Sequence, residues 1–209
     1  MNTVWTFGDS LTDGFRSDNI WAKKYVEWKG YIPLTYGEII SKKLNYNLIN
    51  LGKGGSDNNT IFESFIKNID NIKDGDIVII GWSDIGRFRL ATKNNEWCSF
   101  VPNFDYNMKN MENISNQTIM EVCVNRLSDI YIDELNHFIK IMKYSLPNNI
   151  IYNWSPFLNI RNSVANLENI IAPSGINIET NGLVNDYHYG QSAHLNLAMY
   201  FYKKIKSIK

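Results

Sequence analysis

The sequence predicts a three-layer α/β/α sandwich with a central, mostly parallel sheet. Two observations indicate this fold class: short apolar runs recur along the chain, and segments with apolar residues at helical spacing separate them. Strands that alternate with helices imply right-handed crossovers, which give a parallel sheet with helices on both faces. Because 209 residues suit one domain with a sizeable core, we expect residues 1–209 to form a single domain.

Four apolar runs are the expected strands, and they span residues 4–7, 46–51, 77–80 and 150–154. The segment between the first two opens with Pro33, which we expect in the first turn of a helix because proline is favoured there. Its apolar residues then follow at helical spacing: Leu34, Ile39, Ile40 and Leu44.

Three further segments show helical patterns. Residues 58–69 place five apolar side chains on one predicted helix face: Ile61, Phe62, Phe65, Ile66 and Ile69. Residues 117–144 predict one long or broken helix after the third strand. Residues 192–209 predict an amphipathic helix that ends in lysines, which helix C-termini favour.

Residues 86–116 contain many aromatic and polar side chains but show weak periodicity. A loop of this length inside a compact domain is usually functional. Because the segment follows the third strand, we expect it near the carboxyl ends of the strands, where open α/β sheets bind ligands. We therefore interpret residues 87–116 as a lid-like insertion or pocket wall.

Composition narrows the function classes. The chain has 21 Lys and Arg against 21 Asp and Glu, so no basic face favours nucleic acid as a partner. Cys98 and Cys123 form no metal or disulfide pattern, and both are interpreted as thiols. No apolar run is long enough for a membrane span, and no secretion signal is visible. We expect a cytoplasmic protein, although a viral or lysis-released one would show the same features, and the oligomeric state stays open.

Ser10 raises the question of chemistry because it lies where the first strand enters a turn, and it is either a helix cap or a nucleophile. A serine hydroxyl needs a base and a third group that holds this base. Of three histidines, His137 lies in a helical pattern and His194 is expected to pack or cap. His188 is the candidate base, because Asp186 is two residues away in the same polar stretch.

The sequence resembles the SGNH, or GDSL, hydrolase superfamily, which has a flavodoxin-like α/β/α fold. Residues 8–14 read GDSLTDG and match its first block, and Asp186 and His188 match its last block as Asp-x-His. The resemblance implies that Ser10 is the nucleophile and that Asp186 orients His188. It also implies that a glycine N–H from NLGKGGSDNNT stabilises the oxyanion, with Gly55 as the best match and Gly54 as the alternative.

The third block of the superfamily normally supplies an asparagine, but here it reads Gly81, Trp82, Ser83, Asp84. Ser83 or Asn58 is the candidate replacement donor, and loss of such a donor lowers turnover about a hundredfold to a thousandfold. Asp9 and Trp82 complete the expected site. Trp82 is expected to stack on sugar rings or to pack in the core, as are Trp97, Phe100 and Tyr106.

The resemblance therefore implies a serine esterase that needs no metal or organic cofactor. We expect a small-molecule or glycan ester with a short acyl group as substrate, an O-acetylated carbohydrate among the candidates. As His188 must be neutral to act as a base, activity should fall below a pH of about 6 to 7. Alternatives are a lysophospholipase or thioesterase of this superfamily, or a catalytically weakened domain for glycan binding or assembly. A flavodoxin-like nucleotide binder is disfavoured, because GDSLTDG places acidic groups where phosphate would bind.

Overall fold

The computed structural model describes most of the predicted α/β framework. The described residues are 1–14, 20–91, 97–100, 129–157, 160, 164, 167 and 190–208. Their strands are β1 (Thr3–Gly8), β2 (Asn47–Asn50), β3 (Ile77–Gly81), β4 (Phe88–Ala91), β5 (Trp97–Phe100) and β6 (Ile150–Trp154). Their helices are α1 (Ser10–Asp13), α2 (Ile20–Lys29), α3 (Tyr36–Leu44), α4 (Asn58–Asn68), the 3₁₀ turn η1 (Ile69–Asn71), α7 (Asp129–Ser145) and α9 (Gln191–Ile208).

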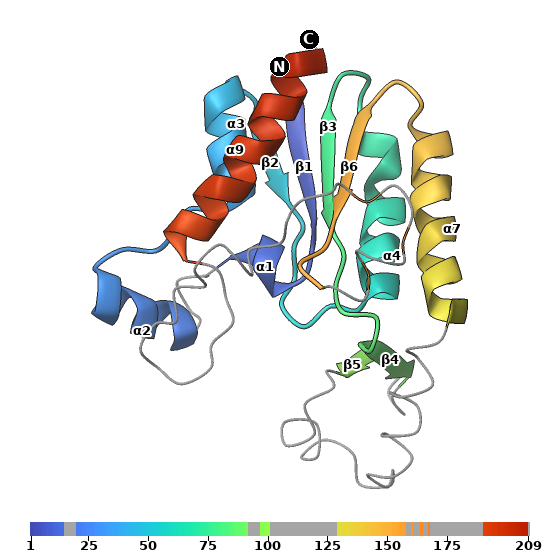
Figure 1. The fold of residues 1–209 in the computed structure, drawn as a ribbon, viewed down its shortest axis with the longest axis horizontal. Coiled ribbons are helices and arrows are strands. Elements are labelled where there is room, and N and C mark those ends of the chain that lie inside the picture. Colours follow the sequence, from blue (N-terminus) through green and yellow to red (C-terminus); the bar gives the residue numbers. More distant parts are fainter. Residues whose placement is uncertain are drawn as a thin grey trace, which may run out of the picture.

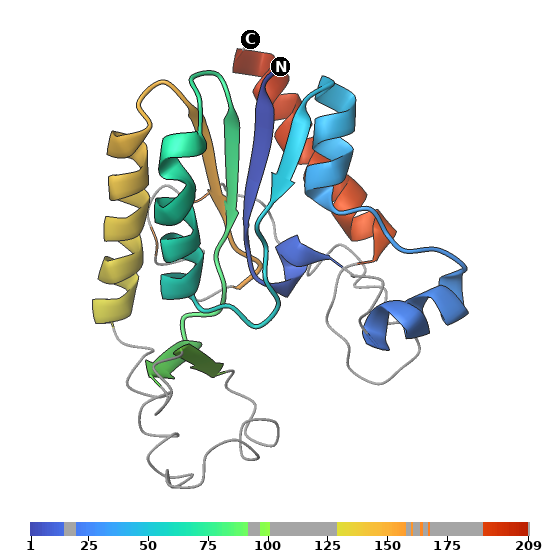
Figure 2. The ribbon, with the colours of Figure 1, turned by 180° about the vertical axis from the view of Figure 1, so that it is seen from behind.

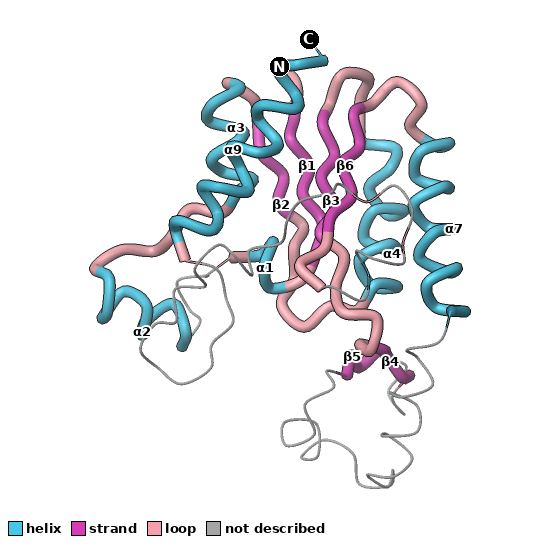
Figure 3. The backbone as a smooth tube through the Cα atoms, viewed as in Figure 1, coloured by secondary structure: helices cyan, strands magenta, loops and turns pink. Residues whose placement is uncertain are grey.

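Four strands form a parallel sheet in the order β2-β1-β3-β6. Strand β1 lies inside the sheet, where Val4 faces Leu48 of β2 and Ile77 of β3 in register. The carboxyl ends of all four strands lie at one edge of the sheet, at the bottom of Figure 1. Figure 3 shows the same strands in magenta. The predicted parallel sheet is confirmed.

Helices cover both faces of this sheet. Helices α3 and α9 pack on one face, and α4 and α7 pack on the other (Figures 1 and 2). The side chains of β1 alternate accordingly: Val4 belongs to the core beneath α3 and α9, whereas Trp5 and Phe7 belong to the core beneath α4 and α7. The predicted three-layer arrangement is therefore confirmed, and all of β3 is buried, as parallel strands covered on both faces are.

Helix starts are set by side-chain caps. Thr35 accepts a hydrogen bond from the N–H of Glu38, and the Glu38 carboxylate accepts one from the Thr35 N–H, which is a capping box. The helix consequently starts at Tyr36, so the expectation that Pro33 lies in its first turn is wrong. Asp57 caps α4 by accepting from the N–H of Thr60.

The predicted apolar face of α4 is correct only in part. Ile61 and Phe65 are buried, but Ile66 is 41% exposed. An α-helix turns through 3.6 residues, so a face that contains Ile61 and Phe65 leaves Ile66 at its solvent edge. Residues 129–145 form the helix predicted within 117–144, whose first part lies outside the described residues.

The segment interpreted as a lid contains two strands that its weak periodicity did not predict. Strands β4 and β5 pair antiparallel and lie beyond the carboxyl edge of the sheet (Figure 1). Residues 92–96 and 101–116 of the segment lie outside the described residues, so its interpretation as a lid stays a prediction. Across the described ranges, no helix is both long enough and apolar enough to cross a membrane.

Gly8 ends β1 at a point where the chain leaves no room for a side chain. A Cβ there would lie 2.1 Å from the Thr12 Oγ1 and 2.9 Å from the Gly81 carbonyl oxygen. We expect Gly8→Ala to lower the free energy of unfolding by about 1–3 kcal/mol, because such overpacking must displace α1 or β3. Urea denaturation measures this loss. Gly54→Ala is the matched control, since its Cβ would meet nothing closer than 3.8 Å; equal losses in both variants would contradict the argument.

Candidate active site

The candidate site lies at the carboxyl ends of β1, β2 and β3, where their loops meet. Strand β1 leads into Asp9 and Ser10, the loop after β2 contains Gly54 and Gly55, and β3 leads into Ser83. Parallel strands bring these segments together because their carboxyl ends share one edge. Backbone hydrogen bonds join the first two loops: the N–H of Lys53 donates to the Gly8 carbonyl at 3.0 Å.

Ser10 is not the cap of its helix. Asp9 is the N-cap of α1, and its Oδ1 accepts a hydrogen bond from the N–H of Leu11 at 3.0 Å. Ser10 is the first helical residue and is only partly buried. No described residue hydrogen-bonds with its hydroxyl or its N–H. The question of cap or nucleophile is thus settled against the cap, and the Ser10 hydroxyl serves no structural hydrogen bond among the described residues.

The three glycines of the loop after β2 differ in what each backbone does. A Cβ on Gly52 would lie 2.4 Å from the Asp13 nitrogen, so Gly52 lets the loop pack against α1. The Gly54 N–H donates to the Asp13 Oδ2 at 3.1 Å, which commits that donor. Gly55 has a φ of 78°, a backbone conformation that favours glycine, and its N–H has no acceptor within the described parts of the chain. Of the two predicted glycine donors, only Gly55 keeps its N–H available.

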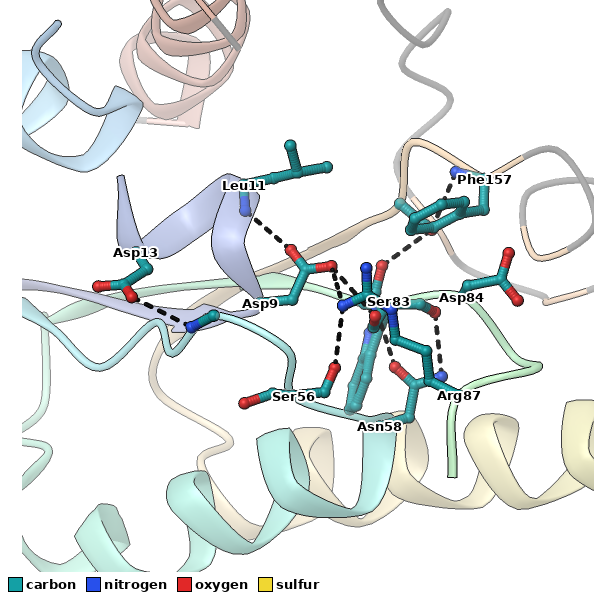
Figure 4. Close-up of polar contacts among 12 residues, drawn as sticks. Asp9, Leu11, Asp13, Ser56, Asn58, Ser83, Asp84, Arg87 and Phe157 are labelled. Atoms are coloured by element: carbon teal, nitrogen blue, oxygen red, sulfur yellow. Dashed lines mark hydrogen bonds and ion pairs between the residues drawn. The ribbon is translucent and has the colours of Figure 1, made fainter. Parts of the chain in front are cut away.

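Asn58 and Ser83 are joined by two hydrogen bonds. The Ser83 N–H donates to the Asn58 Oδ1 at 2.8 Å, and the Asn58 Nδ2 donates to the Ser83 carbonyl at 3.1 Å. An amide Nδ2 carries two hydrogens, so one remains for another acceptor. This pairing fixes the start of α4 against the loop after β3 (Figure 4).

The Ser83 hydroxyl is not available to a substrate. Ser83 is fully buried, and its Oγ donates to the Asp9 Oδ2 at 3.0 Å. The expectation that Ser83 offers its hydroxyl to an oxyanion is therefore corrected, because its single hydrogen already binds a carboxylate. Of the two candidate replacement donors, the geometry favours Asn58.

Arg87 is a residue of this network that the sequence analysis missed. Its Nη1 lies 3.1 Å from the Asp9 Oδ2 and 3.4 Å from the Ser56 carbonyl oxygen (Figure 4). The Arg87 and Asp9 side chains are only 14% and 4% exposed. The only sequence signal was a cation a few residues after the third block, and spacing alone does not identify its partner.

Trp82 is a core residue, so of the two expectations for it the structure favours packing in the core over stacking on a sugar. It is 1% exposed, its indole N–H donates to the Asn153 Oδ1 at 3.0 Å, and its ring stacks with Phe138. Alternation along the chain after β3 turns Trp82 toward the core beneath α4 and α7. The other predicted ring-stacking residues differ: Trp97 is 60% exposed, the side chain of Phe100 is outside the described set, and so is all of Tyr106.

Asp186 and His188 lie outside the described residues, so their predicted roles stay predictions. The helix that follows them is described. His194, in the first turns of α9, is buried and stacks on Tyr36 with ring centroids 6.3 Å apart. The Tyr36 hydroxyl hydrogen-bonds with the Thr12 Oγ1 at 3.1 Å, so α9 is connected through α3 to α1. His194 packs, as predicted, and His137 lies on the exposed side of α7.

Tyr36, whose hydroxyl hydrogen-bonds with Thr12 of α1, has a shifted pKa. Burial raises the pKa of Tyr36 well above its ordinary value, so its hydroxyl stays protonated and keeps its bond with Thr12. Within the described parts of the chain, no group of three or more His, Cys, Asp or Glu side chains is arranged to hold a metal ion.

Comparison with known proteins gives structural likenesses only. No family model and no curated protein matches the chain. A carbohydrate esterase family 2 enzyme with its carbohydrate-binding domain, from Corynascus thermopiles (Myceliophthora fergusii), covers 99% of this chain at 13% identity, with a TM-score of 0.48. An acetyl xylan esterase from the rumen bacterium Butyrivibrio proteoclasticus covers 99% at 13% identity, with a TM-score of 0.47.

A third likeness is a protein from Desulfitobacterium hafniense DCB-2, whose name assigns it to the G-D-S-L family of lipolytic proteins. It covers 78% of this chain at 14% identity, with a TM-score of 0.36. The present chain spans 66%, 64% and 65% of these three proteins in turn, slightly less than two thirds. At such identities, a likeness concerns the fold and leaves substrates to be argued from the residues of this chain.

Proposed function

We propose that this chain is a serine ester hydrolase of the SGNH/GDSL superfamily, with Ser10 as its nucleophile. The observation that carries the proposal is the position of Ser10 as the first residue of α1, at the carboxyl end of β1. Asp9 and not Ser10 caps this helix, so the Ser10 hydroxyl is not used as a cap. A partly buried hydroxyl at this edge of a parallel sheet suits attack on a bound ligand. The GDSLTDG block adds the resemblance to the superfamily.

Three donors would stabilise the oxyanion that forms on the ester carbonyl. They are the N–H groups of Ser10 and Gly55 and the second Nδ2 hydrogen of Asn58. The two N–H groups have no acceptor among the described residues, and Asn58 is held rigidly by its two bonds to Ser83. Donors fixed before the reaction stabilise developing charge without reorganisation.

His188 is the proposed base, and the position of α9 supports this role. Only two residues separate His188 from Gln191, the first residue of α9, and three residues of extended chain reach roughly 10 Å. The first turns of α9 are in turn connected to α1 through His194, Tyr36 and Thr12. These contacts support a base just before α9 that acts on the helix starting at Ser10.

The reaction follows from these roles. His188 takes the Ser10 proton while the Ser10 Oγ bonds to the ester carbonyl carbon, and Asp186 accepts a hydrogen bond from the other ring nitrogen. The leaving alcohol takes that proton from His188 and departs, which leaves an acyl-serine. His188 then deprotonates a water molecule that attacks the acyl carbon. Release of the acid returns the proton to Ser10.

We propose a short acyl group, with O-acetylated carbohydrates as candidate substrates. Trp97 supports this choice because its ring is 60% exposed on the hairpin beyond the carboxyl edge of the sheet. The Arg89 guanidinium lies over the ring at 4.4 Å from its centroid and would hold the ring in place while its exposed part stacks on a sugar. Faster hydrolysis of esters with longer acyl groups would favour the alternative, a lysophospholipase or thioesterase.

Hydrolysis of p-nitrophenyl esters with rising chain length, together with acetylated sugars, tests the proposal. We expect turnover that falls as the acyl chain lengthens, and a fluorophosphonate that labels Ser10, located by mass spectrometry of the labelled peptide. Absence of both turnover and labelling in folded protein would contradict the proposal. That outcome would favour a catalytically weakened domain that binds glycans or takes part in assembly.

A further inference from the structure

The ion pair between Arg87 and Asp9 involves the residue that directly precedes the candidate nucleophile, Ser10. Arg87 is the residue before β4, and it reaches the carboxyl end of β1 across the loop that follows β3. The carboxylate oxygen that it contacts, Asp9 Oδ2, also accepts from the buried Ser83 hydroxyl. Figure 4 shows Ser83 and Arg87, both from the loop between β3 and β4, converging on the Asp9 carboxylate.

The second carboxylate oxygen of Asp9, Oδ1, contacts the helix that starts at the candidate nucleophile. Asp9 Oδ1 accepts from the Leu11 N–H and so caps α1 around Ser10. Asp9 is thereby held by one donor from its own turn and by two donors from the loop between β3 and β4, Ser83 and Arg87. A shift of the Asp9 side chain would change the first turn of α1, on which Ser10 lies.

Charge and burial make Arg87 the decisive member of this set. A buried carboxylate needs a partner, and a buried ion pair is better attested as a device that fixes geometry than as a source of stability. The guanidinium is planar and always charged, so it holds a carboxylate in one orientation more strictly than a lysine ammonium does. Its Nη1 also lies 3.4 Å from the Ser56 carbonyl, one residue after Gly55, so the same group contacts the glycine loop.

We infer that Arg87 is a positioning residue: through Asp9 and the Ser56 carbonyl it aligns the Ser10 turn with the Gly55 loop. The inference rests on the proposed esterase function for its kinetic consequence. Its structural content is independent of that function, since it states that the first turn of α1 is held in place by Arg87.

The kinetic test compares Arg87→Met and Arg87→Lys with Lys43→Met. Lys43 is the control because its substitution also removes one cation, and it is an exposed side chain in the last turn of α3 that covers the Tyr202 ring. That turn leads into the start of β2, at the opposite end of the sheet from Asp9. Turnover of p-nitrophenyl acetate is expressed per fluorophosphonate-labelled serine, so loss of folded protein does not lower it. We expect Arg87→Met to lower kcat about a hundredfold with KM changed less than about threefold. Arg87→Lys should recover part of this loss, and Lys43→Met should keep kcat.

Hydrogen exchange of the peptide over residues 8–14 is the second readout. We expect faster exchange in Arg87→Met and wild-type exchange in Lys43→Met, because only Arg87→Met loses the group that holds Asp9. This readout applies even if the wild-type protein has no Ser10-dependent turnover, which would end the proposed function alone. Wild-type kcat per labelled serine, or unchanged exchange where turnover is absent, would overturn the role of Arg87.

Arg87→Met leaves the buried Asp9 carboxylate without its cation, so a second variant is used where Arg87→Met does not fold. The double variant Asp9→Asn, Arg87→Met removes both charges and keeps an acceptor for the Leu11 N–H. A lowered kcat per labelled serine with faster exchange over residues 8–14 supports the inference. Wild-type values of both in the folded double variant overturn it.

Discussion

Ser10→Ala is expected to lower ester turnover roughly 10⁴- to 10⁶-fold in kcat, the range found when a serine nucleophile is removed. The free energy of unfolding should change by less than about 0.5 kcal/mol, because the hydroxyl bonds to no described residue. Activity and stability thus separate at this position. Steady-state kinetics with p-nitrophenyl acetate and urea denaturation of the same preparation measure both.

Ser207→Ala is the matched control for this prediction, since Ser207 is an exposed serine near the end of α9. It should keep wild-type kcat and fluorophosphonate labelling. Turnover in Ser10→Ala above about a tenth of the wild-type rate would exclude Ser10 as the nucleophile, because no triad enzyme keeps such activity without it.

Asn58→Asp is expected to lower kcat by about 10²- to 10³-fold, the usual effect of losing one oxyanion donor. Aspartate can still accept the hydrogen bond from the Ser83 N–H, so the substitution keeps one of the two bonds to Ser83. It removes the Nδ2 donor and places a negative charge where the oxyanion would form. The measurement is kcat per labelled serine.

Ser83→Ala is the informative comparison for Asn58. Its hydroxyl donates to Asp9, which keeps its bonds from Leu11 and Arg87, so kcat should fall less than about tenfold. Stability should fall by about 1 kcal/mol for the lost hydrogen bond. A larger kcat loss in Ser83→Ala than in Asn58→Asp would reverse the assignment of the two residues.

Local patterns predicted the framework well because each depends on a few neighbouring residues. The runs that became β1, β3 and β6 are almost continuously apolar, as in parallel strands that helices cover on both faces, and most of their residues are buried. Strand β2, at the edge of the sheet, keeps alternate residues exposed. Helix starts were less accurate: the capping box of Thr35 and Glu38, and not Pro33, determines where α3 begins. Strands β4 and β5 were missed because a short antiparallel pair depends on its partner strand.

The candidate site shows the same division at the level of single atoms. Sequence alone indicated Ser10, Gly55 and Asn58 as candidates, because residue type and order along the chain mark them. It left Ser83 and Asn58 as equal alternatives, since both carry donors. The structure distinguishes them, because the single hydroxyl hydrogen of Ser83 is donated to Asp9. Asn58 donates one Nδ2 hydrogen to the Ser83 carbonyl and keeps a second one for another acceptor.

The sequence by itself determined the four strands of the central sheet and their parallel direction. It also determined the helices that became α3, α4, α7 and α9, and the serine at the end of the first strand. Only the tertiary structure decided which polar groups are already paired: Asp9 with Arg87, Gly54 with Asp13, and Trp82 with Asn153 in the core. The reason is that secondary structure follows from nearby residues, whereas a hydrogen bond or ion pair needs two atoms from distant segments at one place.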